Sequence, residues 1–311
     1  MKFRAAMLIS VALASIAACS PPDPLAQQRG VCGSSTAEAE AKVAACSALI
    51  DSGKLDVANR SIALANRGGA SEEAGDVTAA LRDFQAALEA DPENLRAVRG
   101  RASILIGSGQ LDAAEPLVDR LIAGGELADI AYYLKGDIRA QRSDAAGALA
   151  AYDASIRANS QFALALAGRG RVKQGQSDHA GALADFNAAL AVNPQLTPAL
   201  AGRCWARVLM KDGDVAAARS DADAATAADP RDVRAQMCRG LLQLRAQEWE
   251  GARESYDAAL AVEAGNPTAL FGRGIARRRA GDDAGREDMN LARDFDRHIG
   301  EQFRDLGVET F

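Results

Sequence analysis

Few side chains in this 311-residue chain could carry chemistry, because it has only two histidines and five cysteines. His179 and His298 lie far apart in sequence, and we interpret each as a surface or helix-capping residue. No Cys-x-x-Cys pair offers the spacing of a zinc site. Gly168-Arg169-Gly170 is glycine-rich, but no strand is expected before it, which disfavours a phosphate-binding loop. Acidic residues are abundant without forming an identifiable acid–base pair, so we predict no catalytic residues, no metal site, no cofactor and no enzyme.

The first residues have the pattern of an export signal, with two basic residues followed by an apolar run that ends at residue 18. The run is too short to cross a bilayer comfortably. It ends in Ile16-Ala17-Ala18-Cys19, which resembles the bacterial lipobox. This resemblance implies cleavage before Cys19 and lipidation of its thiol, while ordinary signal-peptidase cleavage is the alternative. Ser20 stands where an aspartate would favour inner-membrane retention, so an outer-membrane location is favoured.

The remaining cysteines indicate disulfides. Setting Cys19 aside leaves four, and an even number in an oxidising compartment suggests two bridges. Cys32 would join Cys46 on the first helix. Cys204 and Cys238 are 34 residues apart and would join neighbouring helices, or would simply be small buried side chains.

The charge of the chain disfavours nucleic acid as a partner. The net charge is −6 at pH 7, and loss of Lys2 and Arg4 with the signal leaves 34 basic and 42 acidic residues. Binding to phosphates needs clustered lysine and arginine. We therefore expect no nucleic-acid partner, and nothing in the sequence points to a small-molecule substrate.

A period of about 34 residues organises most of the chain. Basic residues recur at spacings of 34, 34, 34, 34, 36 and 34 residues, and a small residue follows each. An alanine comes twelve residues after most of these small residues. Four positions after the alanine stands an aromatic residue in most copies, as at Phe84 and Tyr152. The basic positions are Arg67, Arg101, Lys135, Arg169, Arg203, Arg239 and Arg273.

This pattern resembles the tetratricopeptide repeat (TPR), with small residues at repeat positions 8, 20 and 27, an aromatic at 24 and proline at 32. The resemblance covers about residues 57–295. It implies an all-α solenoid, a right-handed superhelix of about seven antiparallel helix pairs, each with a helix A and a helix B. No unit buries its apolar face alone, so stability would come from stacking.

Amphipathic segments at 36–52 and 297–306 would cap the two ends of the array. The chain from Cys32 also resembles exported alphaproteobacterial TPR lipoproteins, in the segments 50–53, 203–205 and 306–308. Those relatives pair the mid-chain cysteine with one near position 222, which is alanine here, so the Cys204–Cys238 pairing stays open. The predicted regions are a signal peptide (1–18), the lipidated cysteine with a flexible, extended tether (19–31), an N-terminal capping helix (32–56), the repeats (57–295) and a C-terminal capping helix (296–311).

The TPR resemblance implies a concave groove lined by A helices at repeat positions 2, 5, 9 and 12. Met237 and Leu241 at such positions are more typical of packing. Two roles are equally consistent with Trp205: it could anchor a bound partner, or it could fill the space created by the two-residue insertion in its repeat. The groove lacks the repeated lysine and asparagine of TPR domains that clamp a C-terminal carboxylate. The predicted partner-binding residues are Arg99, Ser103, Tyr133, Asp137, Arg171, Gln174 and Trp205.

The recurring basic residues stand at repeat position 7, directly before the small residue at position 8. These position-7 cations admit two interpretations. They could bind an acidic peptide, or each could lie over the adjacent helix and pair with a repeat carboxylate such as Asp83 or Asp185. Strict periodicity favours the second interpretation, because a binding site rarely needs every repeat to be the same.

We therefore predict a scaffold anchored in the envelope of a Gram-negative bacterium, with its lipid in the outer membrane and its repeats facing the periplasm. Its partners would be other proteins or peptides, and it would contact the membrane only through the lipid anchor. The alternative is a structural, self-associating spacer (a homo-oligomer), against which the two end caps argue.

Overall fold

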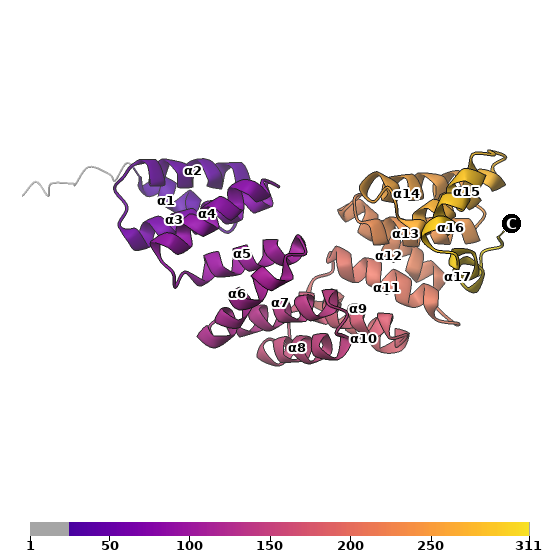
Figure 1. Cartoon of the computed structure of the whole chain (residues 1–311), viewed down its shortest axis with the longest axis horizontal. Coiled ribbons are helices and arrows are strands. Elements are labelled where there is room, and N and C mark those ends of the chain that lie inside the picture. Colours follow the sequence, from indigo (N-terminus) through magenta and orange to yellow (C-terminus); the bar gives the residue numbers. More distant parts are fainter. Residues whose placement is uncertain (1–24, 311) are drawn as a thin grey trace, which may run out of the picture. The chain divides into compact units, whose positions relative to one another are not determined.

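The structure, a computed structural model, describes residues 25–310. Every regular element in this range is a helix, which confirms the predicted all-α class (Figure 1). The predicted signal peptide, Cys19 and the proline-rich start of the tether lie outside the described residues. Over residues 25–310, no helix combines the length and the apolar character needed to span a membrane.

The helices that precede and begin the array are α1 (Ala26–Cys32), α2 (Ala39–Asp51), α3 (Val57–Glu73), α4 (Val77–Ala90), α5 (Leu95–Gly107), α6 (Leu111–Gly124), α7 (Ala128–Gln141) and α8 (Ala145–Ala158). The others are α9 (Ala163–Gly175), α10 (His179–Val192), α11 (Thr197–Leu209), α12 (Val215–Ala228), α13 (Val233–Arg245), α14 (Trp249–Val262), α15 (Pro267–Arg279), α16 (Gly285–Phe295) and α17 (Ile299–Asp305). From α3 to α16 they alternate as helix A and helix B of seven repeats.

Aspartates in the turns begin many of the B helices. The carboxylate of Asp76 accepts a hydrogen bond from the backbone N–H three residues later, at the start of α4. Asp144, Asp178 and Asp214 do the same for α8, α10 and α12. Gly75, which precedes Asp76, has a φ of +84°, a left-handed conformation that glycine adopts without strain.

The chain divides into two compact units, residues 1–100 and 101–311, and the division falls within α5. In the first unit, α2 packs on α3 and α3 packs on α4, so α2 covers the first repeat. Helix α1 packs on α2 and α3.

In the second unit, each A helix packs antiparallel to its own B helix, as the successive pairs from α7/α8 to α15/α16 show (Figure 1). Each A helix also contacts the A helix of the next repeat, so that α7, α9, α11, α13 and α15 form one continuous wall. Helix α17 packs against α15 and α16 and covers the last repeat.

An aromatic side chain at repeat position 24 fills the space between successive repeats. Tyr152 is completely buried between Gly136 of its own repeat and Gly168 of the next. A Cβ atom on Gly136 would lie 2.5 Å from the Tyr152 ring, and one on Gly168 would lie 2.7 Å from it. Phe186 occupies the same place in the following repeat, beside Gly202. The aromatic therefore packs against the next unit as well as against its own. The glycine at position 6 of the next repeat, which the sequence pattern does not single out, lies as close to the ring as the glycine at position 8.

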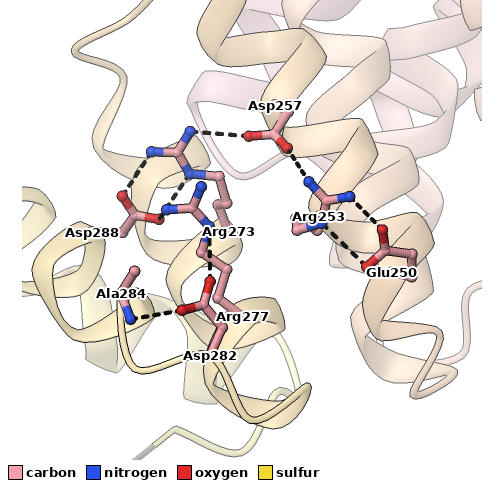
Figure 2. Close-up of polar contacts among 8 residues, drawn as sticks. All are labelled: Glu250, Arg253, Asp257, Arg273, Arg277, Asp282, Ala284 and Asp288. Atoms are coloured by element: carbon pink, nitrogen blue, oxygen red, sulfur yellow. Dashed lines mark hydrogen bonds and ion pairs between the residues drawn. The ribbon is translucent and has the colours of Figure 1, made fainter.

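The position-7 cations join neighbouring B helices, as Figure 2 shows for Arg273. Its Nη2 donates a 2.7 Å hydrogen bond to Asp288 of the same repeat, and its Nη1 donates a 3.0 Å hydrogen bond to Asp257 of the preceding repeat. Arg169 bridges Asp185 of its own repeat and Asp153 of the preceding one in the same manner. Arg67 pairs with Asp83 of its own repeat and donates a hydrogen bond to Ser47 on α2. The structural interpretation of these cations is therefore confirmed for these repeats. In the repeat of Arg239 the hydrogen-bond partners are neutral: Ser255, Thr226 and Gln236.

Two disulfides lie within the described residues. Cys204 on α11 is bonded to Cys238 on α13, with their Cα atoms 6.5 Å apart, so this bond joins the A helices of successive repeats. Cys32 is bonded to Cys46, with a Cα–Cα distance of 4.9 Å. The sequence predicts an extended tether up to residue 31, but residues 26–32 form α1 instead. The bonded, buried Cys32 holds the end of this segment on α2, and no proline lies between Pro24 and the end of α1 to oppose a helix.

Candidate partner-binding groove

Five of the predicted partner-binding residues converge in the second unit, on α7, α9 and α11. They line two adjoining cavities, of about 210 and 370 Å³. We call the surface around these cavities the groove. The residues brought together are Tyr133, Asp137, Arg171, Gln174 and Trp205.

The first cavity is polar on one side. Asp137 on α7 accepts a 2.6 Å hydrogen bond from the buried hydroxyl of Tyr152 and lies 3.4 Å from the guanidinium of Arg171. Tyr133 packs edge-on against Phe162, with 5.4 Å between the ring centroids. Burial, helped by the negative charge of Asp137, raises the pKa of the Tyr133 hydroxyl, which therefore stays protonated.

The second cavity is mainly apolar. Its wall includes Trp205, Leu209 and Met237, and Gln174 lies at its edge. The indole N–H of Trp205 donates a 2.9 Å hydrogen bond to the backbone carbonyl of Arg234, which fixes the ring against α13. Trp205 is thus both packed on its neighbouring repeat and exposed to the cavity, which combines the two interpretations offered by the sequence.

Arg234 lines both cavities, and sequence reasoning missed it. Its Nη2 donates a 2.8 Å hydrogen bond to Oε1 of Gln174, so the side chain extends from α13 past α11 to α9. Burial lowers the pKa of its guanidinium, and the nearby charge of Arg171 acts in the same direction. Arg234 stands at position 2 of its repeat, and the TPR resemblance implies that position 2 lines the groove. The repeat position could therefore have identified Arg234 as a groove residue.

Two other predicted residues take no part in these cavities. Arg99 belongs to the first unit, where its charge interacts with Glu72. Ser103 is half-buried on α5. Leu241 is fully buried in the core, as its interpretation as a packing residue requires, whereas Met237 both packs on the core and lines the second cavity.

The C-terminal segment covers the wall beyond α13. Nε of Arg245 donates a 2.6 Å hydrogen bond to the backbone carbonyl of Leu306, and Val308 is buried. Trp249 and Arg279 line a further cavity beside this segment.

The groove can form hydrogen bonds, ion pairs and apolar contacts, which are the means of recognising a polypeptide. Over residues 25–310, no group of three or more His, Cys, Asp or Glu residues is arranged to hold a metal ion. His179 begins α10 and His298 precedes α17, where its ring lies 3.2 Å from Glu301. Both histidines therefore lie at helix ends, away from the groove residues.

Comparison with known proteins agrees with this architecture. Sequence profiles described as tetratricopeptide repeat match residues 72–135, 205–261 and 239–285. A chain in the crystal structure of the APC/C hetero-tetramer Cut9–Hcn1 aligns with a TM-score of 0.66 and 14% identity, over 90% of this chain and 55% of its own length. A tetratricopeptide repeat protein from Parabacteroides merdae ATCC 43184 aligns with a TM-score of 0.50 and 17% identity, over 78% of this chain and 97% of its own. A search of curated proteins found no match. The chain thus carries tetratricopeptide repeats and has the fold of a TPR α-solenoid.

Proposed function

We propose that this protein is an interaction scaffold that binds a peptide or a helix of a partner protein in the groove between α7 and α13. The observation that carries the proposal is the convergence of Tyr133, Asp137, Arg171, Gln174 and Trp205 around two adjoining cavities. These residues differ in type from repeat to repeat, while the framework residues behind them recur. Variable residues on a constant framework are typical of a recognition surface on a repeat protein.

The chain from the Cut9–Hcn1 structure belongs to a hetero-tetramer. A fold like that of the present protein is therefore compatible with binding to another protein. This likeness concerns the fold alone. The choice of groove residues depends on the cavities of this chain.

We further propose that the scaffold is lipid-anchored at Cys19, in the outer membrane, with its repeats in the periplasm. The support is the lipobox-like Ile16-Ala17-Ala18-Cys19 and the resemblance to exported alphaproteobacterial TPR lipoproteins. The two disulfides favour an oxidising compartment as well. Mass spectrometry of the mature N-terminus tests this: an unmodified chain beginning before Cys19 would contradict anchoring.

Affinity capture from detergent-solubilised envelopes tests partner binding. The bait is the full chain, compared with a Tyr133→Ala/Arg171→Ala variant of the groove. A control variant, Arg253→Ala/Val262→Ala, changes the same number of side chains on α14 instead. Circular dichroism checks that each variant is folded. Proteins retained by the wild type and the control, and lost with the groove variant, support the proposal. Retention that is equal for all three baits would argue against it.

Self-association as a spacer is the competing function. Helices α2 and α17 pack on the first and last repeats, which disfavours end-to-end stacking of these repeats. Light scattering at high protein concentration decides the matter, because a monomer excludes the spacer.

A further inference from the structure

The groove holds two arginines and two aspartates, but their charges are unevenly paired. Arg234 is largely buried, yet its side chain hydrogen-bonds to the neutral amide of Gln174, and within residues 25–310 no carboxylate lies within ion-pair distance of it. A buried cation without a paired anion is costly, and proteins seldom keep one without a partner. The charge of Arg171 also acts on Arg234, so two cations stand close to each other.

The acidic residues of the groove are already engaged. Asp137 accepts the hydrogen bond of Tyr152 and contacts Arg171. Asp232 begins α13, where its carboxylate accepts a 2.8 Å hydrogen bond from the backbone N–H of Ala235. The charge of Asp232 favours the charged form of Arg234, but neither carboxylate forms an ion pair with this guanidinium.

A third donor lacks an acceptor at the same place. Oε1 of Gln174 accepts the hydrogen bond of Arg234, which sets the orientation of the amide. The Nε2 of Gln174 is then buried without a hydrogen-bond partner among residues 25–310. Unsatisfied buried donors are rare and call for an explanation. An anionic acceptor supplied by a ligand in the groove would pair with the guanidinium groups of Arg171 and Arg234, both of which line the cavities.

The positions of the two arginines indicate what kind of anion fits. Arg171 and Arg234 line both cavities and so stand between them. A ligand carboxylate held there has space on either side, which suits the side chain of an internal residue better than a chain terminus. The second cavity, with Trp205, Leu209 and Met237, suits a large apolar side chain of the same ligand.

We propose that the groove recognises an extended segment of a partner protein in which an internal Asp or Glu lies two residues from a large apolar side chain. The carboxylate binds between Arg171 and Arg234, and the apolar side chain enters the cavity beside Trp205. Side chains two residues apart in an extended segment point to the same side, so both reach the wall together. The inference rests on the proposed function and specifies the chemistry of its partner.

Selection from a random peptide library displayed on phage tests the inference, with the full chain in mild detergent as the target. Enriched peptides are expected to contain Asp or Glu two residues from an aromatic or large aliphatic residue. Their affinity is then measured by fluorescence anisotropy. Arg234→Gln and Arg171→Gln should each weaken binding by about tenfold or more, because each removes a charge-assisted hydrogen bond. Arg231→Gln, an exposed arginine of the turn before α13, is the matched control and should leave the affinity unchanged.

A double-mutant cycle assigns the contact. Replacing the peptide's acidic residue by its amide should weaken binding to the wild type, but weaken binding to Arg234→Gln much less. Raising the NaCl concentration from about 50 to about 500 mM should weaken wild-type binding too, because salt screens the ion pairs.

The outcomes separate this inference from the proposed function. Peptides that bind through Tyr133 and Trp205 but carry no acidic residue would overturn the inference and leave the scaffold proposal standing. Acidic peptides that bind equally well to wild type and Arg234→Gln would do the same. A library that yields no peptide sensitive to any groove substitution would contradict both.

Discussion

The buried hydroxyl of Tyr152 donates a 2.6 Å hydrogen bond to Oδ1 of Asp137 and thereby links the framework of α8 to the groove wall on α7. Tyr256 occupies the same repeat position and is equally buried, but its hydroxyl has no hydrogen-bond partner among the described residues. The two tyrosine rings therefore pack in the same way, but only the hydroxyl of Tyr152 is hydrogen-bonded.

Replacing each tyrosine by phenylalanine should separate these roles. Tyr152→Phe is expected to destabilise the protein by about 1–2 kcal/mol, because a hydrogen bond to a charged group is lost. Tyr256→Phe should be neutral or stabilising by up to about 1 kcal/mol, since an unsatisfied buried hydroxyl is removed. Thermal unfolding followed by circular dichroism measures both. Equal losses for the two variants would mean that the Asp137 contact contributes nothing.

The same tyrosines predict a loss of stability in alkali. Burial raises the pKa of the hydroxyls of Tyr133, Tyr152 and Tyr256 in the folded state, whereas the unfolded chain ionises near the ordinary value of about 10. Above that pH the unfolded state releases protons that the folded state retains, so stability falls as the pH rises. Below it both states are protonated and the tyrosines cause no pH dependence.

The expected measurement is a decline in the free energy of unfolding that begins near pH 10. Tyr256→Phe removes one of the three groups, so its free energy of unfolding should fall less steeply with pH than that of the wild type. Parallel curves for the wild type and Tyr256→Phe would show that the tyrosine does not retain its proton in the folded state.

Much of the framework can be predicted from the sequence because its contacts are local and repeated. Arg169 and Asp185 lie 16 residues apart within one helix pair, as do Arg67 and Asp83, so their pairing follows from the repeat itself. The Cys204–Cys238 bond joins equivalent regions of successive repeats and was open from the sequence alone.

The rest depends on longer-range geometry. The contact between Arg234 and Gln174 joins residues 60 apart in two repeats that are not consecutive, and only the spacing of α9, α11 and α13 brings them together. Helix α1 likewise depends on tertiary structure, because Cys32 is held on α2 by its bond to Cys46. A pattern that repeats every 34 residues contains neither piece of information.

Close approach of helices predicts sensitivity at glycine. A Cβ atom on Gly202 would lie 2.3 Å from Cζ of Phe186, whereas one on Gly69 would meet nothing within 4 Å. Gly202→Ala should therefore destabilise the protein by about 1–3 kcal/mol through overpacking. Gly69→Ala, within α3, should stabilise it by up to about 1 kcal/mol, because alanine favours the helix. Chemical denaturation compares the two, and a neutral Gly202→Ala would show that the Phe186 ring moves aside easily.

The ion pairs in Figure 2 differ in expected strength. Arg273 is largely buried and holds the buried carboxylate of Asp288 as well as Asp257, so Arg273→Ala should cost about 2 kcal/mol. Arg277 also contacts Asp288 and limits the loss. Arg253 pairs with Glu250 and Asp257 along the surface of α14, and Arg253→Ala should change the thermal midpoint little. If Arg253→Ala proved the more damaging, burial would not be what determines the strength of these pairs.

The disulfide between Cys204 and Cys238 lies directly behind the groove. Trp205 follows one cysteine and Met237 precedes the other, so the bond fixes the distance between the two helices that form the apolar cavity. Cys204→Ala/Cys238→Ala should lower stability by about 2–4 kcal/mol, because the bond closes a loop in the unfolded chain.

The same variant should bind the peptides selected on the groove more weakly, because α11 and α13 can then separate and the cavity loses its fixed width. Cys32→Ala/Cys46→Ala is the control, since that bond lies in the first unit and joins α1 to α2. It should lower stability without changing the affinity of the selected peptides. A reducing agent should reproduce both effects in the wild type, but should leave peptide affinity unchanged in the Cys204→Ala/Cys238→Ala variant. If removing the Cys204–Cys238 bond lowers stability but peptides bind as before, helix packing alone maintains the cavity, and the disulfide serves only the fold.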